Sequence, residues 1–478
     1  MHWASQRVFT GERILRGYLR GQLALMASFA MYHSFFSPLA HALAGPAAIG
    51  AGRSGYTTAV AVFSPIAGVL VERMSTRRVL IGAFVSRAVI WAGLLPLLFY
   101  ALGAGWAFYA AFIGLMFLDG AIVSINSLVD IDQGGIDLLG KQYNIAVGDR
   151  LRNRYNTIMS GFISGSRIIV VPAMAALGVF AFGVLRSATG ALVFTMAVSF
   201  AVPCLIGVYF YARYIPRQAV APGAGSGDLA RTSGQIVSRL ADGLRLSWTN
   251  PNVRSRIGLA ACERVVEDSF VFLVLTEFGM QALAPRNAAW GALATSLLIA
   301  VGKLGALISA WAMHRYWRAP TPEGARYPAY RMFFPMAFLA TVFTLLMPVA
   351  LNLLHLGHFW LGAAIAGASN LLFNLLFEPA KLGFRTYTQG LVRDEGAPGR
   401  IFGIQMTIIM ATNAVGIVGL SSLFVALTMG SALWIVTGLY AAFGLFEFIV
   451  APRLLFTPVE RATARGLLAR RSVRWGSG

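Results

Sequence analysis

The sequence predicts an all-α integral membrane protein with twelve transmembrane helices in two pseudo-symmetric six-helix bundles. Hydrophobic residues make up 57% of the 478 residues and charged residues only 12%, whereas about a quarter of the residues are charged in a water-soluble chain. The apolar residues gather in twelve segments, each close to the roughly 20 residues that a helix needs to cross the hydrocarbon core. The positive charges alternate with these segments in the way that a multi-pass protein requires.

The twelve segments follow one another along the whole chain. They lie near residues 22–44, 55–71, 79–102, 106–129, 158–180, 189–212, 257–280, 287–313, 332–354, 356–379, 403–427 and 430–452. We interpret the first as a retained helix and not as a signal peptide, because it is longer than the apolar part of a signal peptide. Removing it would also reverse the side of every later loop.

The distribution of Lys and Arg sets the orientation. With the N-terminus inside, the inside segments hold 32 of the 39 basic residues, and the outside loops hold only Arg53, Arg186 and Arg286. The positive-inside rule then places both termini in the cytoplasm. The net charge of +20 therefore reflects membrane topology, so we expect the lipid bilayer as partner and no nucleic acid.

The chain divides at its longest hydrophilic break. We assign residues 1–212 to an N-terminal six-helix bundle, 213–256 to a cytoplasmic linker, and 257–478 to a C-terminal six-helix bundle with a basic cytoplasmic tail. The linker begins with a Pro/Gly/Ser-rich stretch of flexible-linker composition. The ends of the fourth and tenth segments also echo each other, with an Asn and an acidic residue four positions apart in both. A parallel duplication of this kind predicts a substrate site between the halves, near the middle of the membrane.

Two motifs resemble the major facilitator superfamily. Residues 68–78 resemble its loop signature G-x-L-x-D-R-x-G-R-R, with Glu72 in place of the Asp. Residues 161–172 are similar to the Gly/Pro-rich fifth helix of exporters in this superfamily. The resemblance implies a secondary transporter in which two six-helix bundles rock against each other. It also implies that Glu72, Arg73 and Arg77 form a gating latch on the cytoplasmic side.

A second, narrower likeness concerns the stretch from Ser124 to Ala175, whose layout resembles the same region of ferroportins. This likeness implies a divalent metal exporter as an alternative. The metal ligands of that family have no residue-by-residue counterparts in the sequence, so the metal ligands remain unassigned.

The seventh segment carries the densest group of charges, namely Glu263, Arg264, Glu267 and Asp268. An ionised group at the middle of a membrane helix costs about 2.5–3.5 kcal/mol on insertion scales, so such groups indicate function. Arg264 lies within one helical turn of Glu267 and Asp268 but cannot neutralise every neighbour. We therefore expect an excess of carboxylate, and we assign proton or cation coupling to Glu267 and Asp268, with Glu263 as a further candidate. Structural salt bridges near the cytoplasmic rim are the alternative.

Other polar groups within the apolar segments are also candidates. Asp119 and Arg167 could form a buried pair between neighbouring helices, or Arg167 could bind an anionic substrate in a bidentate manner. We expect Arg87 and Lys303 to extend toward an interface. His33, in the middle of the first segment, could titrate near neutral pH. The remaining substrate or coupling candidates are Asn126, Asp130 and Glu378.

The chemistry that the sequence lacks narrows the function. It contains no phosphate-binding loop, no zinc-ligand spacing and no hydrolase motif, so we expect neither an enzyme nor a cofactor. We predict a secondary active transporter of a small solute by alternating access, coupled to H⁺ or another cation, with export as one option. The alternatives are a ferroportin-like metal exporter and a non-transporting scaffold, sensor or lipid scramblase. The 36 Arg against 3 Lys suggest a GC-rich bacterial gene and hence the bacterial cytoplasmic (inner) membrane.

Overall fold

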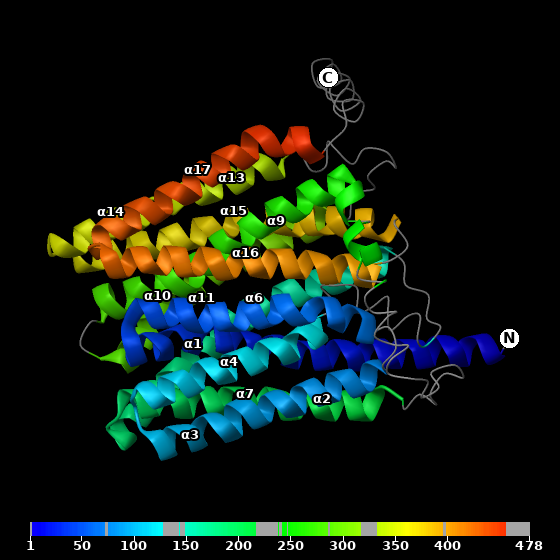
Figure 1. Ribbon diagram of the computed structural model, residues 1–478, viewed down its shortest axis with the longest axis horizontal. Helices are drawn as coiled ribbons and strands as arrows, with labels where there is room; N and C mark the ends of the chain where they lie inside the picture. Colours follow the sequence, from blue (N-terminus) through cyan, green and yellow to red (C-terminus); the bar gives the residue numbers. More distant parts are fainter. Residues whose placement is uncertain are drawn as a thin grey trace.

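The computed structural model describes residues 2–71, 75–127, 143, 149–216, 238, 241–245, 247–284, 287–316, 332–394 and 398–455. Within these ranges the regular elements are all helices. Most of them run along the long axis of the molecule, and α1 begins at the same end at which α17 finishes (Figure 1). An all-helical chain is what lipid favours, because a helix satisfies its own backbone hydrogen bonds.

The first half of the chain begins with a helix that is broken once. Its elements are α1 (His2–Val71), α2 (Thr76–Ala88), η1 (Val89–Leu94), α3 (Leu95–Leu102), α4 (Trp106–Ser127), α6 (Asp149–Leu185) and α7 (Ala188–Tyr214). Within α1, Ala44 and Gly45 leave the helical conformation, and Gly45 has a φ of 70°, which glycine adopts without strain. The two arms then pack on each other, since a Cβ on Gly52 would lie 3.1 Å from the Phe36 ring.

The second half contains a helical path interrupted by two π-helical turns. Its elements are α9 (Pro251–Ser269), η3 (Phe270–Val274), α10 (Leu275–Glu277), η4 (Phe278–Leu283), α11 (Ala288–Tyr316), α13 (Phe333–Phe343), α14 (Leu346–His355), α15 (Phe359–Asp394), α16 (Pro398–Ala426) and α17 (Met429–Leu455). Asn250 begins α9 as a cap, because its Oδ1 accepts hydrogen bonds from the backbone N–H groups of Asn252 and Val253, and Pro251 occupies the first turn, where it is tolerated. The first π turn starts just after Asp268. Such turns are frequent at functional sites.

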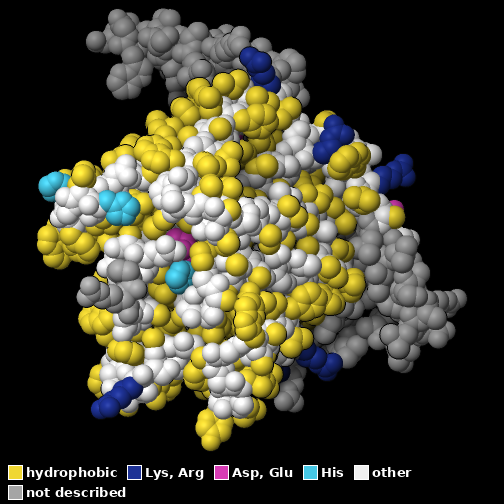
Figure 2. All heavy atoms as spheres, turned by 60° about the vertical axis from the view of Figure 1, so that its left-hand side comes forward, with side chains coloured by type: hydrophobic (Ala, Val, Ile, Leu, Met, Phe, Trp, Pro, Cys, Tyr) yellow, Lys and Arg dark blue, Asp and Glu magenta, His cyan; other side chains and the backbone are white. Residues whose placement is uncertain are grey.

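The chain is a multi-pass membrane protein. In the described residues, nine helices are long and apolar enough to cross a membrane: Thr76–Leu102, Trp106–Ile125, Gly161–Leu185, Ala188–Tyr214, Ala288–Met313, Phe333–His355, Phe359–Phe384, Gly403–Ala426 and Met429–Leu455. Hydrophobic side chains cover much of the face that Figure 2 shows. Tyr100, Trp106 and Trp360 are strongly exposed beside helix ends, as aromatic side chains are at a membrane interface.

Two seams join the halves: α1 packs against α16, and α6 packs against α11. The first is tight, because a Cβ on Gly403 would lie 3.1 Å from the Ser64 carbonyl oxygen. Further along the same seam, the Thr407 hydroxyl donates a hydrogen bond to the Ala61 carbonyl at 3.0 Å. Small residues allow this close approach of membrane helices.

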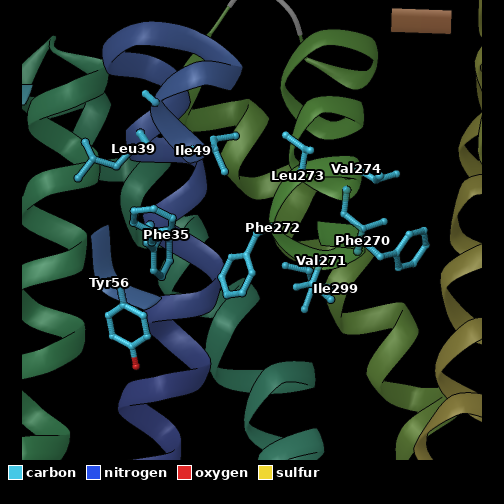
Figure 3. Close-up of a cluster of buried hydrophobic side chains, with 14 of the residues drawn as sticks. Phe35, Leu39, Ile49, Tyr56, Phe270, Val271, Phe272, Leu273, Val274 and Ile299 are labelled. Atoms are coloured by element: carbon cyan, nitrogen blue, oxygen red, sulfur yellow. The ribbon is translucent and has the colours of Figure 1, made fainter. Parts of the chain in front are cut away.

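A hydrophobic core continues across the boundary between the halves. In Figure 3 the Phe272 ring lies between α1, which carries Phe35 and Tyr56, and the helical segment that carries Phe270 and Val271. Phe272 also meets the Phe36 ring edge-on, with 6.3 Å between the ring centroids. The halves are thus in direct apolar contact beside the charged groups described below.

The structure corrects the placement of three basic residues. Arg53, expected in an outside loop, is 1% exposed within α1, because the helix resumes directly after Gly45. Arg87 and Lys303, expected to reach an interface, are 1% and 5% exposed. Most of the expected linker 213–256 lies outside the described residues.

Candidate functional site

Charged and amide side chains from both halves meet where the halves face each other. We call this set the central charge cluster. It consists of Arg53 on α1, Arg167 on α6, Arg264, Glu267 and Asp268 on α9, Lys303 on α11, Glu378 and Lys381 on α15, and Asn413 on α16.

Asp268 connects the two halves. Its Oδ2 accepts hydrogen bonds from Arg53 Nη2 at 2.6 Å and from Asn413 Nδ2 at 2.7 Å. Its Oδ1 lies 3.2 Å from Arg264 Nη2. Arg53 belongs to the first half of the chain, whereas Arg264 and Asn413 belong to the second. The pair of Arg53 and Asp268 is therefore a buried ion pair across the boundary, and charge-assisted hydrogen bonds of this kind are the strong ones.

Aromatic rings hold the Arg53 guanidinium in place. Its central carbon lies 4.8 Å from the Tyr56 ring centroid and 4.3 Å from the Phe272 ring centroid. Tyr56 follows Arg53 by three residues, and Phe272 follows Asp268, the ion-pair partner of Arg53, by four, so each ring lies about one helical turn from one member of the ion pair. Cations are attracted to the faces of aromatic rings at such distances. Each half thus contributes one ring.

Glu267 is also paired twice. Lys381 Nζ lies 2.6 Å from Oε1, and Arg264 Nη1 lies 3.4 Å from Oε2. Lys381 Nζ is 3.9 Å from Glu378 as well. The expected excess of carboxylate around Arg264 is therefore wrong, because Arg53 and Lys381 supply further positive charge from α1 and α15.

Two cations of the cluster have no carboxylate partner among the residues that the structure describes. Among the described residues Arg167 forms no ion pair, although Glu267, Glu378 and Asp268 all act on its charge. Lys303 Nζ donates to the Asn374 amide oxygen at 2.6 Å, and Asn374 in turn donates to the Asn370 amide oxygen at 2.7 Å. A neutral amide satisfies the hydrogen bond of Lys303 without compensating its charge.

Two other buried pairs lie within single halves. Arg87 binds Asp119 through Nε and Nη2 at 2.7 and 3.2 Å, so the expected partnership of Asp119 with Arg167 is wrong. Arg256 binds Glu263 in a bidentate manner at 2.6 and 2.8 Å. The Glu263 pair has the salt-bridge arrangement that the sequence left as an alternative.

Another polar contact joins the two halves, nine residues beyond Asp268 along the chain. His41 Nε2, on the first arm of α1, lies 3.4 Å from Glu277 Oε2 on α10. Gln281 donates a hydrogen bond to the same Glu277 carboxylate. The contact between α1 and the stretch from α9 to η4 therefore contains polar groups at two places, Arg53 with Asp268 and His41 with Glu277.

Some expected site residues lie outside the described residues. These are Glu72, Arg73 and Asp130, together with the side chains of His33 and Asn126. Arg77 is described, and its Nη2 donates to the Ala212 carbonyl of α7 at 3.0 Å, a contact within the first half. The cytoplasmic latch therefore stays a prediction.

Sequence reasoning missed four members of the cluster. Arg53 was counted as a loop residue, Lys303 was expected to extend toward an interface, Lys381 was placed in a cytoplasmic segment, and Asn413 carries no charge to attract notice. Continuing the second helix upstream to Pro46 places Arg53 about two turns inside it. That position within a span is the signal that could have found it.

Within the described residues, no group of three or more His, Cys, Asp or Glu side chains gathers in a way that could hold a metal ion. Cys204 and Cys262 are both free thiols. The ferroportin-like alternative is therefore not favoured by any observation in the described part of the chain.

Solved structures match nearly the whole chain. The nucleoside transporter NupG is 12% identical, covering 91% of this chain and 98% of its own, with a TM-score of 0.58. A POT family transporter in complex with 5-aminolevulinic acid is 13% identical, covering 92% and 97%, with a TM-score of 0.60. The xylose transporter XylE from E. coli, in a partially occluded inward-open conformation, is 12% identical, covering 93% and 98%, with a TM-score of 0.60.

No protein-family model and no curated protein matches the sequence. At 12–13% identity the structural matches establish the fold. They do not establish the function, because one fold can carry many functions. The fold is that of these solved transporters, and it is shared with FucP, a major facilitator superfamily transporter in the outward conformation, at 12% identity and a TM-score of 0.55. The resemblance that the sequence motifs indicated is thereby confirmed at the level of the fold.

Proposed function

We propose that the protein is a secondary active transporter that moves a small solute by alternating access. The observation that carries this proposal is the buried ion pair between Arg53 and Asp268, which joins the two halves at the centre of the molecule. Alternating access needs a central site between two bodies that move relative to each other. The structural neighbours are transporters of a nucleoside and of xylose and a POT family transporter, which agrees with a small solute.

The proposed moving bodies are six-helix bundles, residues 1–212 and 257–478, joined by the segment 213–256. Nine spans are the helices named above. The other three would be the two arms of α1 and the path from α9 to η4, residues 251–283. We place the chain in a bacterial inner membrane with both termini in the cytoplasm, as the charge distribution predicts.

Rocking of the two bundles would open the seam between α1 and α16 and the seam between α6 and α11 alternately. Because Arg53 and Asp268 belong to different bodies, a movement that separates α1 from α9 breaks their ion pair. Breaking a buried ion pair is costly unless new partners form, and Asp268 keeps Arg264 and Asn413 on its own side. The carboxylate can thus lose its partner across the boundary without becoming isolated.

Coupling to protons or another cation would use Glu267 and Asp268. Glu267 is held by Lys381 from α15 of the same bundle, so a rearrangement of α15 against α9 within that bundle would change the charge that surrounds it. We propose that Glu267 is ionised in one access state and protonated or cation-bound in the other. A ligand shifts such an equilibrium only by binding the two states differently.

The test is solute transport by purified protein in sealed vesicles, with a solute chosen by thermal-shift screening of sugars, nucleosides, amino acids and carboxylates. The variant Glu267→Gln should lose accumulation driven by a pH gradient but keep equilibrium exchange, because exchange needs no net movement of the coupling ion. The matched control Glu12→Gln removes an exposed carboxylate whose ion pair in the described part of the chain is with Arg16 on its own helix, and it should behave as the native chain.

Two results would count against the proposal. Full gradient-driven accumulation by Glu267→Gln, with an unchanged pH dependence, would place the coupling elsewhere. Absence of flux for every solute that stabilises the folded protein would favour the non-transporting scaffold, sensor or scramblase.

A further inference from the structure

We infer that the central charge cluster binds an anionic solute through carboxylate or phosphate groups, with Arg167 and Lys303 as its principal contacts. This inference rests on the proposed function, because it takes the cluster as the place where the solute sits. It names the class of substrate, which neither the fold nor the structural neighbours define for this chain.

The balance of charge in the cluster is the first argument. With every group in its charged form, the described residues supply five cations (Arg53, Arg167, Arg264, Lys303 and Lys381) against three carboxylates (Glu267, Asp268 and Glu378). Two positive charges are therefore in excess. Burying charge in a membrane protein is expensive unless it is paired, so an excess of one sign indicates that the opposite charge comes from a ligand.

The second argument is the position of the two cations without carboxylate partners. Arg167 lies on α6 and Lys303 on α11, and these two helices form one of the seams between the halves. The positive charge of Arg167 acts on Lys303. Like charges on two packed helices repel, and an anion bound between them would offset that repulsion.

Access to the cluster is the third argument. The side chains of Arg264 and Lys381 retain 26% and 32% of their accessible surface, although both form ion pairs. Arg167 is only partly buried. The packing of the helices therefore does not seal these three cations, in contrast to Lys303, Arg53 and Arg87.

The chemistry of the two groups matches an anion. A guanidinium presents a planar pair of donors that fits a carboxylate or phosphate in a bidentate manner, and an ammonium binds the same groups as a point charge. A neutral polyol could accept the hydrogen bonds but would leave both charges uncompensated. A cationic solute would be repelled.

The experiment is binding to the full-length protein in lipid nanodiscs, by calorimetry and by thermal unfolding at constant ionic strength. The probes are acetate, succinate, citrate and inorganic phosphate, with sorbitol as the neutral comparison. A ligand that binds only the folded state raises its apparent stability. We expect at least one of the anions to bind and sorbitol not to, and the carboxylate and phosphate probes decide between the two anion classes.

The variant Arg167→Gln should weaken binding of that anion by about tenfold to a hundredfold, as loss of a hydrogen bond to a charged group does. Arg167→Lys, which keeps the charge but not the planar pair of donors, should fall between. The control Arg213→Gln removes an exposed arginine at the end of α7 and should leave affinity unchanged. If Arg167→Gln fails to fold, Arg167→Lys alone still carries the test.

Several outcomes would overturn the inference: no stabilisation by any of the four anions, equal anion binding by the native chain and Arg167→Gln, or binding of sorbitol in their place. These outcomes are separate from failure of the transport proposal. Flux of a neutral solute would support the proposed transport function and contradict the proposed anion site. Anion binding that depends on Arg167, without flux in vesicles, would keep the site and reject transport.

Discussion

The ion pair between Arg53 and Asp268 should control both stability and the opening of the halves. At an N–O distance of 2.6 Å and an effective dielectric constant near 20, the Coulomb attraction is about 6 kcal/mol. Desolvation offsets part of it, so we expect a coupling free energy of about 2–4 kcal/mol in a double-mutant cycle of Arg53→Gln and Asp268→Asn. The single change Asp268→Asn should cost about 3–5 kcal/mol, because it withdraws a buried charge from its partner.

The same pair should bias the conformational equilibrium, because it links residues on different halves. If it forms only while α1 and α9 are together, losing about 2 kcal/mol multiplies the separated population about thirtyfold. Asn413→Ala is the matched control, because Asn413 donates to the same Asp268 oxygen from the second half alone. It should lower stability without changing the separation.

Thiol labelling measures the separation. A single cysteine in place of Thr407 sits in the seam against Ala61, in a background where the buried Cys204 is replaced by Ala and the exposed Cys262 by Ser. Asp268→Asn should increase its labelling rate, and the Asn413→Ala control should not. The reasoning is refuted if the cycle gives a coupling below about 0.5 kcal/mol, the usual error of additivity, or if both variants label alike.

Three further predictions concern packing, a structural pair and coupling. Gly305→Ala should destabilise the protein by about 1–3 kcal/mol in thermal unfolding, because its Cβ would lie 2.3 Å from the Leu371 carbonyl oxygen. Asp119→Asn should cost about 3–5 kcal/mol, and the double change Arg87→Met with Asp119→Leu should recover most of it. In weakly buffered solution, binding of the anion should be accompanied by proton uptake that Glu267→Gln abolishes, as a pH electrode would record.

Each of these predictions has an outcome that contradicts it. Gly82→Ala is the control for the packing change, because open space surrounds that position; equal losses at both glycines would deny the close approach at Gly305. If the double variant is no more stable than Asp119→Asn, then the Arg87–Asp119 pair contributes more to stability than the mutual compensation of two buried charges. Proton uptake that persists in Glu267→Gln would assign the proton to another group.

Hydropathy predicted the helices well because lipid leaves the backbone few options. The apolar segments near 106–129, 189–212 and 430–452 correspond to α4, α7 and α17 within a few residues. The break in α1 was predicted too long, as a loop from 45 to 54, because Arg53 looked incompatible with a span. Its burial depends on Asp268, which lies 215 positions away in the sequence. The hydropathy pattern does not predict a contact between residues so far apart.

The site was predicted in part for the same reason. Charges inside the seventh segment marked Glu267 and Asp268 correctly as members of a buried cluster, since their cost in lipid is visible from the sequence alone. Their partners were not visible: Lys381 lies just beyond the apolar part of its segment and reaches Glu267 only because α15 packs beside α9. The net charge of the central charge cluster is therefore positive, whereas the sequence predicted an excess of carboxylate.

That change of sign alters how coupling would work. A surplus of carboxylate would bind a proton directly, whereas a surplus of cations binds an anion first. An anion that engages Lys381 competes with Glu267 for the same ammonium group, which lies 2.6 Å from the carboxylate. Once released, Glu267 keeps, among the described residues, the ion pair with Arg264 at 3.4 Å and becomes easier to protonate. Linkage makes the effect reciprocal, so protonation of Glu267 must raise the affinity for the anion by the same factor. Proton and anion would then load together although they occupy different groups, and the ion pair between Arg53 and Asp268 need only respond to the combined change in charge.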